Sequence, residues 1–271
     1  MNESLVRALS GIVYIILLLG ATLFSPISFV MLFGIFMLIA ITEFCRLANL
    51  NKMLPIAMGV VGYLLFCFLI DTTRSTNMLL NLGALFISFI LLIELFAVKQ
   101  PATGDRTVKL ARFTGYVILP FLLIIRLPFM EPGGYNPYIL IGSFILIWAN
   151  DTFAYIVGKA IGKHKLFERI SPKKTVEGFI GGMVFAIAAA YILTKFEVFI
   201  TPVFHSPVIW MGAAAILVIF GTLGDLVESR LKRNAGVKDS GAIMPGHGGI
   251  LDRLDSIIFA IPFLFLYYQI I

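Results

Sequence analysis

The chain has 271 residues, of which 59% are hydrophobic and only 13% are charged, and its formal net charge is +6. Soluble proteins carry about 25% charged residues, so this composition excludes a soluble globular protein and predicts an integral membrane protein. Apolar runs of about 20 residues, the length that crosses a bilayer as a helix, recur along the whole chain. We therefore expect a single membrane domain over residues 1–271, without a separate soluble domain.

The expected fold class is an all-α integral membrane protein, a polytopic bundle of about nine transmembrane helices. The first apolar run follows a basic residue, as in a signal peptide, but it is too long and lacks a small-residue cleavage site, so we interpret it as the first span. Proline and glycine mark the edges of the loops. The predicted spans are residues 5–24, 27–48, 54–71, 77–98, 113–130, 137–161, 176–195, 207–233 and 250–271.

The basic residues predict how these spans are oriented. Alternation of nine spans places 18 of the 21 lysine and arginine residues on one side, and only Arg74, Arg126 and Lys195 on the other. Because basic residues are retained on the cytoplasmic side, we predict a cytoplasmic N-terminus in a multi-pass protein of the cytoplasmic (inner) membrane. One missed span would scramble this sorting, which supports the count. We expect membrane lipids as partners and no nucleic acid.

Five acidic residues lie within the predicted spans, where an ionisable group usually marks a functional site. All are near the predicted cytoplasmic ends: Glu43, Glu94, Asp151, Asp225 and Glu228. For the first two, snorkelling to the interface or an ion pair with Arg46 or Lys99 is the alternative to a functional role.

Asp151 belongs to a polar interruption, "WANDTFAYIVGKAIGKHK", near the end of the sixth predicted span. Asp151 and Tyr155 are four residues apart and share one face of a helix. A polar clamp between helices is the structural alternative to a site here. Gly158 and Gly162 form a G-x-x-x-G spacing, which predicts close packing against another helix.

The eighth predicted span is about 40 Å long at 1.5 Å per residue, which exceeds a hydrocarbon core of about 30 Å. Its last turns therefore tilt or project into the cytoplasm, with Asp225, Glu228 and Ser229 on one side near that boundary. Cations at the end of this helix also suit its dipole. These cations are Arg230, Lys232 and Arg233.

The loop before the last span ends in "PGHGG", which can turn sharply and bring backbone N–H groups close to a ligand. Asp252 and Asp255 follow, three residues apart on one helix face, so both carboxylates can reach the same cation. Carboxylates with one nearby histidine favour Mg²⁺ or Mn²⁺ over zinc. Stabilisation of the helix N-terminus by acidic residues is the alternative.

The loop before the seventh span, "GKHKLFERISPKKTVEG", is rich in basic residues. Ser171–Pro172 can serve as N-cap and first helical residue, which would place Lys173 and Lys174 beside the free N–H groups of that helix. This arrangement suits a phosphate. Anchoring to anionic lipids is the competing use. Carboxylates for a cation and basic residues for phosphates together predict a polyphosphate substrate, with a lipid as the second substrate.

Residues 229–255, "SRLKRNAGVKDSGAIMPGHGGILDRLD", resemble the signature of the phosphatidate cytidylyltransferase (CDP-diglyceride synthase) family, S-x-L-K-R, four residues, K-D, then P-x-H-G-G-x-x-D-R-x-D. Its nine polar positions are all matched, by Ser229, Lys232, Arg233, Lys238, Asp239, His247, Asp252, Arg253 and Asp255. Met244 stands where Leu, Ile or Phe is usual, a departure that concerns packing. "NDTFAYIVGKAIGKHK" and "SPKKTVEG" resemble upstream motifs of that family, so the specific match covers residues 148–256.

The resemblance implies transfer of CMP from CTP to phosphatidic acid, giving CDP-diacylglycerol and pyrophosphate, with Mg²⁺. The carboxylate donors also allow Mn²⁺, and an additional monovalent cation is left open. We expect an in-line attack on the α-phosphorus of CTP that depends on positioning and charge neutralisation. The expected catalytic residues are Asp225, Asp252, Asp255 and Lys238. The expected metal ligands are Asp225, Asp252, Asp255 and Asp151, the last either as a ligand or as its neighbour.

The residues expected to bind phosphates of CTP or phosphatidate are Lys173, Lys174, Arg230, Lys232, Arg233, Arg253, His247 and Ser229. For His247, contact with a phosphate or the cytosine competes with a hydrogen bond inside the loop. Asp239 is expected to orient Lys238 rather than to bind metal.

Two other functions are compatible with parts of this pattern. A kinase or transferase acting on a lipid alcohol shares the charge arrangement but does not need the complete signature. A secondary transporter is disfavoured because the polar residues cluster at one face and not at the membrane midplane. We expect residues 1–112 to form a scaffold on the lipid side and residues 137–271 to carry the site at the cytoplasmic face. Small-residue helix faces also suit a homodimer.

Overall fold

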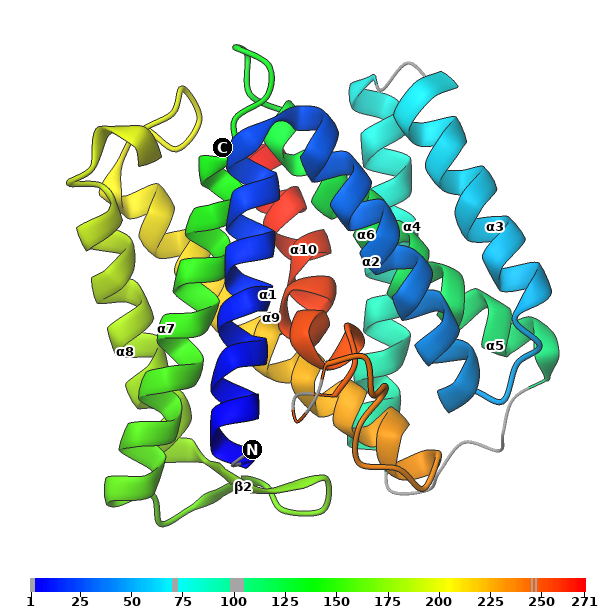
Figure 1. Ribbon diagram of the computed structural model, residues 1–271. Coiled ribbons are helices and arrows are strands. Elements are labelled where there is room, and N and C mark those ends of the chain that lie inside the picture. The colour runs from blue at the N-terminus through cyan, green and yellow to red at the C-terminus, as the bar shows by residue number, and fades with distance from the viewer. Residues whose placement is uncertain (1–2, 70–72, 98–104, 245, 247) are drawn as a thin grey trace.

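The computed structural model describes residues 3–69, 73–97, 105–244, 246 and 248–271, and this part of the chain is almost entirely helical (Figure 1). Within it, seven helices are long and apolar enough to cross a membrane. Two shorter apolar helices, Leu9–Phe24 and Met53–Phe68, accompany them, so every predicted span has a helical counterpart. The chain is an all-α polytopic membrane protein.

The first half of the chain consists of helices with two π-helical turns. Its elements are α1 (Glu3–Phe24), α2 (Pro26–Leu47), α3 (Met53–Leu64), η1 (Leu65–Leu69), α4 (Arg74–Phe96), α5 (Arg106–Phe113), η2 (Thr114–Ile118), α6 (Leu119–Arg126) and η3 (Leu127–Phe129). The fifth helix begins at residue 106 and not at the predicted residue 113, because the polar segment "RTVKLARF" continues it beyond the apolar run. Asp105 caps this extension by accepting a hydrogen bond from the Arg106 N–H at 2.7 Å.

The second half holds three long helices, a β-hairpin and the C-terminal helix. Its elements are α7 (Tyr138–Ile161), β1 (Lys165–Phe167), β2 (Ser171–Thr175), α8 (Val176–Leu193), η4 (Glu197–Phe199), α9 (Pro207–Asn234) and α10 (Leu251–Ile270). The start of α9 follows the expected signals, since the Ser206 side chain caps it and Pro207 is its first residue.

One local prediction was wrong. Ser171–Pro172 does not begin a helix but opens β2, which pairs antiparallel with β1. The helix starts after Thr175, whose hydroxyl oxygen accepts a hydrogen bond from the Gly178 N–H at 3.1 Å and so provides the N-cap. Lys173 and Lys174 therefore lie on a strand and not at a helix N-terminus.

The helix α10 lies in the middle of the bundle, where it packs against α9, α6 and α4 (Figure 1). Every residue from Ser256 to Phe265 is buried, as expected of a helix that is apolar all round. This buried rod carries Asp252 and Asp255 in its first turns. The position of both carboxylates is therefore set by the core of the protein.

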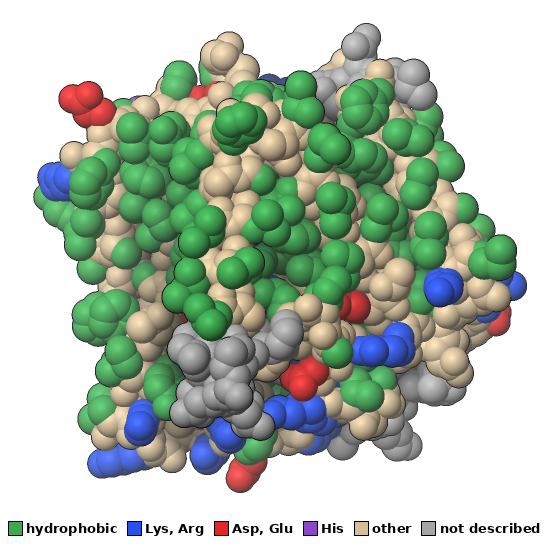
Figure 2. Space-filling view, in the orientation of Figure 1, with side chains coloured by type: hydrophobic (Ala, Val, Ile, Leu, Met, Phe, Trp, Pro, Cys, Tyr) green, Lys and Arg blue, Asp and Glu red, His purple; other side chains and the backbone are tan. Residues whose placement is uncertain are grey.

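The two ends of the bundle differ in charge. The N-terminus and the β-hairpin lie at the lower end in Figure 1, and the C-terminus lies at the upper end, as an odd number of crossings requires. Figure 2 shows hydrophobic side chains over the middle of the same face, with most of the visible Lys, Arg, Asp and Glu side chains toward the lower edge and a few at the upper left. The predicted polar segments thus meet at one end of an apolar bundle.

Helices α7 and α8 approach each other closely, as the G-x-x-x-G spacing predicted. A Cβ atom on Gly158 would lie 3.5 Å from the Gly178 Cα of α8, and one on Gly182 would lie 2.9 Å from the Asn150 backbone oxygen of α7. The backbones of α7 and α8 are therefore in close contact, and this contact fixes the position of α7 and of its Asp151.

Gly182→Leu is expected to lower the thermal denaturation midpoint of the purified protein in detergent. The added side chain must push α8 away from α7, and overpacking of this kind costs about 1–3 kcal/mol. Gly20→Leu in α1 is the matched control, because no atom of the described part of the chain lies within 4 Å of the position of its Cβ. Equal midpoints for the two variants would contradict the close contact between α7 and α8.

Candidate active site

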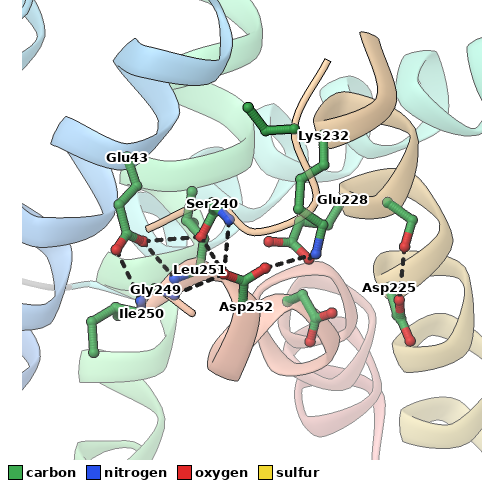
Figure 3. A network of polar contacts seen from close by, with 12 residues as sticks. Glu43, Asp225, Glu228, Lys232, Ser240, Gly249, Ile250, Leu251 and Asp252 are labelled. Carbon is green, nitrogen blue, oxygen red and sulfur yellow. Dashed lines mark hydrogen bonds and ion pairs between the residues drawn. The ribbon is translucent and has the colours of Figure 1, made fainter. Parts of the chain in front are cut away.

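Asp252 forms hydrogen bonds to two separate parts of the loop between α9 and α10. Its Oδ2 accepts hydrogen bonds from the Ser240 N–H at 2.8 Å, the Ser240 hydroxyl at 2.8 Å and the Gly249 N–H at 2.7 Å (Figure 3). Gly248 has φ +83°, and a Cβ there would overlap the Asp252 carboxylate. The glycines therefore let the backbone close on a carboxylate of the chain itself.

Lys232 connects α9 to the same carboxylate. Its ammonium group lies 2.7 Å from Glu228 Oε2 and 2.7 Å from Asp252 Oδ1 (Figure 3). The Glu228 side chain is completely buried, and its Oε1 has no hydrogen-bond partner among the described residues. A buried carboxylate requires a paired cation, so Lys232 has a structural role in joining the end of α9 to the start of α10.

Asp225, about one turn before Glu228 on α9, faces the β-hairpin. Its Oδ2 lies 2.5 Å from the Lys174 ammonium group of β2, and its Oδ1 accepts a hydrogen bond from the Ser229 hydroxyl at 3.2 Å. Both charged side chains are about one-third exposed. The strand that replaces the predicted helix start therefore brings Lys174 to the carboxylate that was predicted as a metal ligand.

Asp151 on α7, Asp225 on α9 and Asp255 on α10 together form an acidic cluster. Asp255 interacts electrostatically with Asp225, Asp151 and Lys174, and Asp151 interacts with the same lysine and with Arg253. The Asn150 side-chain amide donates a hydrogen bond to Asp151 Oδ1 at 3.1 Å. Three helices and one strand thus converge on a small volume at the charged end of the bundle.

Two cavities meet at this cluster, and Asp151 lines both. The larger, of about 340 Å³, lies between α7, α8, α9 and β2, and its charged lining residues are Asp151, Lys159, Lys173, Lys174 and Asp225. The smaller, of about 260 Å³, lies between α1, α7 and α10, and its charged lining residues are Asp151, Asp252, Arg253 and Asp255. The other lining side chains are mostly apolar, with Asn150, Thr175 and Thr222 in the larger cavity and Ser256 in the smaller one. Cavities with both charged and apolar walls suit a ligand that has a charged head and an apolar body.

The cluster fits a divalent cation by donor type and charge. Its donors are all carboxylate oxygens, which Mg²⁺ and Mn²⁺ prefer and zinc does not. In the described part of the chain, no three His, Cys, Asp or Glu side chains already share one metal-binding point. These carboxylates already have one cationic partner, because the Lys174 ammonium group contacts Asp225.

Arg230 lies apart from this cluster, although it was predicted to bind phosphate. Its guanidinium group donates to the Leu95 carbonyl oxygen at 2.9 Å, and Arg169 donates to the Ala97 carbonyl oxygen at 3.0 Å. The carbonyl groups at a helix C-terminus need such donors, so these two arginines cap α4. Arg230 lines neither of the two cavities at Asp151.

The other predicted residues divide between the cavities and the surface. Lys173 is exposed at the larger cavity, and Arg253 is exposed at the smaller one. Arg233 is exposed and donates to the Val237 carbonyl oxygen at 3.3 Å. Lys238 and Asp239 are exposed in the loop. His247 lies outside the described residues.

The two acids at membrane depth in the first half of the chain have different environments. Glu94 forms an ion pair with Arg112 at 2.5 Å. An ion pair was the predicted alternative to a functional role, but the partner is Arg112; the predicted partner Lys99 lies outside the described residues. Glu43 instead accepts hydrogen bonds from the backbone N–H groups at the start of α10. Sequence reasoning missed this role, and its only signal was an acid inside an apolar run.

Comparison with known proteins agrees with this site. The model of the cytidylyltransferase family matches residues 5–271. The phosphatidate cytidylyltransferase of Bacillus subtilis (strain 168) is 37% identical over 265 residues, which cover 96% of this chain and 95% of that protein. The protein of the same name from Staphylococcus aureus (strain COL) is 35% identical over 263 residues, 96% of each chain. The chain therefore belongs to the cytidylyltransferase family.

Proposed function

We propose that this chain transfers CMP from CTP to phosphatidic acid, giving CDP-diacylglycerol and pyrophosphate. The observation that carries the proposal is the cluster of Asp151, Asp225 and Asp255 around Lys174, between two cavities at the charged end of a membrane bundle. Carboxylates suit a cation that binds a triphosphate, and lysine neutralises the remaining charge. Both relatives are named phosphatidate cytidylyltransferases, which supports this pair of substrates.

The proposed reaction forms one bond and breaks one. A phosphate oxygen of phosphatidate attacks the α-phosphorus of CTP, and the bond from that phosphorus to the oxygen bridging the β-phosphate breaks. The electron pair of this bond leaves with pyrophosphate. The phosphatidate phosphate is anionic at neutral pH and needs no strong base, so catalysis depends on positioning and charge neutralisation.

The side chains around the two cavities take distinct roles in this proposal. Lys173 and Lys174 bind phosphates of CTP in the larger cavity, and Arg253 binds the phosphate of phosphatidate in the smaller one. Asp151, Asp225 and Asp255 hold Mg²⁺ or Mn²⁺, which when bound neutralises charge on the phosphates. A monovalent cation is a further option at the same carboxylates. Lys232 and Asp252 act by holding the loop.

The proposal also places the site in the cell. CTP is dissolved in the cytosol, whereas phosphatidate stays in the inner leaflet, so the site must be open to both at the cytoplasmic face of the cytoplasmic membrane. The smaller cavity supports a lateral lipid entrance, because Gly11, Tyr14 and Ile15 of α1 form part of its wall. Basic residues at this end fit the positive-inside rule. A homodimer stays a prediction.

The decisive experiment uses purified protein in detergent micelles with phosphatidate, Mg²⁺ and CTP labelled on either the α- or the γ-phosphate. The α-label is expected in the lipid product and the γ-label in pyrophosphate. A lipid-alcohol kinase would instead place the γ-label in lipid, with diacylglycerol or a polyprenol as acceptor. Transfer of γ-label, or no product from phosphatidate, would overturn the proposal.

A further inference from the structure

Glu43 is a carboxylate in the apolar body of α2 that is directed at another helix. Its side chain is only 6% exposed, so the charge must be satisfied by protein groups. Its partners lie about 200 residues away in the sequence, at the start of α10 and in the loop before it (Figure 3). Glu43 therefore connects the first half of the chain to the acidic cluster.

The hydrogen bonds of Glu43 provide the N-terminal cap that α10 lacks in its own sequence. The Ile250 side chain at the N-cap position cannot accept a hydrogen bond. Glu43 supplies the acceptors from outside, with Oε1 accepting from the Ile250 N–H at 3.1 Å and Oε2 from the Leu251 N–H at 2.9 Å. A carboxylate at this place satisfies free N–H groups and also suits the helix dipole.

The loop before α10 is held by the same segment of α2. The Ser240 hydroxyl lies 3.3 Å from Glu43 Oε2 and 2.8 Å from Asp252 Oδ2, so it links the two carboxylates. Arg46, one turn after Glu43, donates to the Ser240 carbonyl oxygen. A Cβ on Gly241 would overlap the Glu43 carboxylate, so this loop residue must be glycine for the contact to form.

We propose that Glu43 is a positioning residue for CMP transfer, which fixes the first turns of α10 and so sets where Asp255 stands relative to Asp225 and Asp151. Asp252 and Asp255 follow Leu251 within four residues on a rigid helix. A shift of the N–H groups that Glu43 holds therefore moves both carboxylates. This inference rests on the proposed function for its catalytic readout, but the contacts themselves do not depend on any substrate.

Glu43→Gln is the sharpest variant, since it keeps the size of the side chain and removes the negative charge. We expect kcat to fall about 10- to 100-fold, as is typical when a group that orients a catalytic carboxylate is lost, with little change in KM for CTP. We also expect faster hydrogen–deuterium exchange in the peptide 240–255 than in the wild type. Glu94→Gln is the matched control, because that acid also lies near the end of a long helix but forms its ion pair with Arg112 of α5.

Gly241→Ala tests the same contact without changing any charge, and it keeps the test decisive if Glu43→Gln is unstable. The added methyl group overlaps the Glu43 carboxylate and would lie 2.8 Å from the Gly249 Cα, so it pushes α2 and the start of α10 apart. The same loss of kcat and the same faster exchange are therefore expected. Gly133→Ala is its control, since the residues that the structure describes place no atom within 4 Å of the position of its Cβ. Unchanged kcat in both Glu43→Gln and Gly241→Ala would overturn the proposal, as would equal losses of kcat in Glu43→Gln and Glu94→Gln that merely follow their thermal midpoints.

The exchange measurement separates this inference from the proposed function. If the wild type made no CDP-diacylglycerol but exchange in the peptide 240–255 still rose in Glu43→Gln, the proposed function would fail while the contact stood. If the wild type were active and the peptide exchanged identically in both proteins, the positioning role would fail alone.

Discussion

Asp225→Asn and Asp255→Asn should each lower kcat/KM for CMP transfer by about 100-fold or more, because in the proposed reaction each removes a charge that holds the metal at the reacting phosphates. Asparagine has nearly the same shape as aspartate, so the change tests charge rather than packing. The two residues come from α9 and α10, and both interact electrostatically with Lys174. The measurement is transfer of α-label from CTP to phosphatidate over a range of Mg²⁺ concentrations.

The Mg²⁺ series gives this prediction its second readout. A variant that has lost a metal ligand should need more Mg²⁺ for half-maximal activity, whereas a variant that is merely less stable should not. Asp105→Asn is the matched control, since this exposed residue caps α5 and asparagine caps helices as well as aspartate does. Wild-type rates for both Asp225→Asn and Asp255→Asn at saturating Mg²⁺ would refute the assignment.

Asp252 should behave differently from these two aspartates, although the sequence predicted the same role for all three. Its carboxylate accepts hydrogen bonds from the loop backbone, at Ser240 and Gly249, and from Lys232. The partners of the Asp225 carboxylate are instead the side chains of Lys174 and Ser229. Loss of the Asp252 charge therefore releases the loop, and the effect should appear in stability as well as in rate. Only the structure distinguishes the role of Asp252 from that of Asp255, because their spacing in the sequence shows only that the two residues share a helix face.

The spans could be predicted from the sequence because membrane helices are selected by apolar length, a local property. The same reasoning located Asp151 and Asp225, since ionisable side chains in an apolar run are conspicuous. Asp255 was located by its spacing of three residues from Asp252, which places both on one helix face. The start of α5 was misplaced because a helix can continue into polar residues outside the membrane. The β-hairpin was missed because Ser171–Pro172 is compatible with a helix start, and Thr175 took the N-cap instead.

Long-range partners could not be predicted from one sequence. Lys174 and Asp225 are about 50 residues apart, and Glu43 and Leu251 are 208 residues apart. No local periodicity records which carboxylate a distant N–H group meets. The signature loop could be recognised as polar and glycine-rich, but whether its N–H groups bind a substrate or a carboxylate depends on tertiary packing. At Gly249 the N–H group donates to the Asp252 carboxylate of the chain itself.

Lys232→Met should destabilise the protein by about 3–5 kcal/mol, the usual cost of leaving a buried charge without its partner. The Lys232 side chain is 12% exposed and Glu228 is 0% exposed, so water cannot replace the lost ammonium group. Asp252 loses the same partner, but its three other hydrogen bonds remain. The midpoint of thermal denaturation in detergent measures the effect.

The double variant Glu228→Gln/Lys232→Met distinguishes this charge effect from a loss of packing. Removing the second charge should recover a large part of the lost stability, because the neutral amide costs far less to bury than an unpaired carboxylate. Arg233→Met, the neighbouring exposed position, should leave the midpoint almost unchanged. If the double variant were no more stable than Lys232→Met, Glu228 would not be the charge that Lys232 neutralises, and the link between α9 and α10 would depend on the Asp252 contact instead.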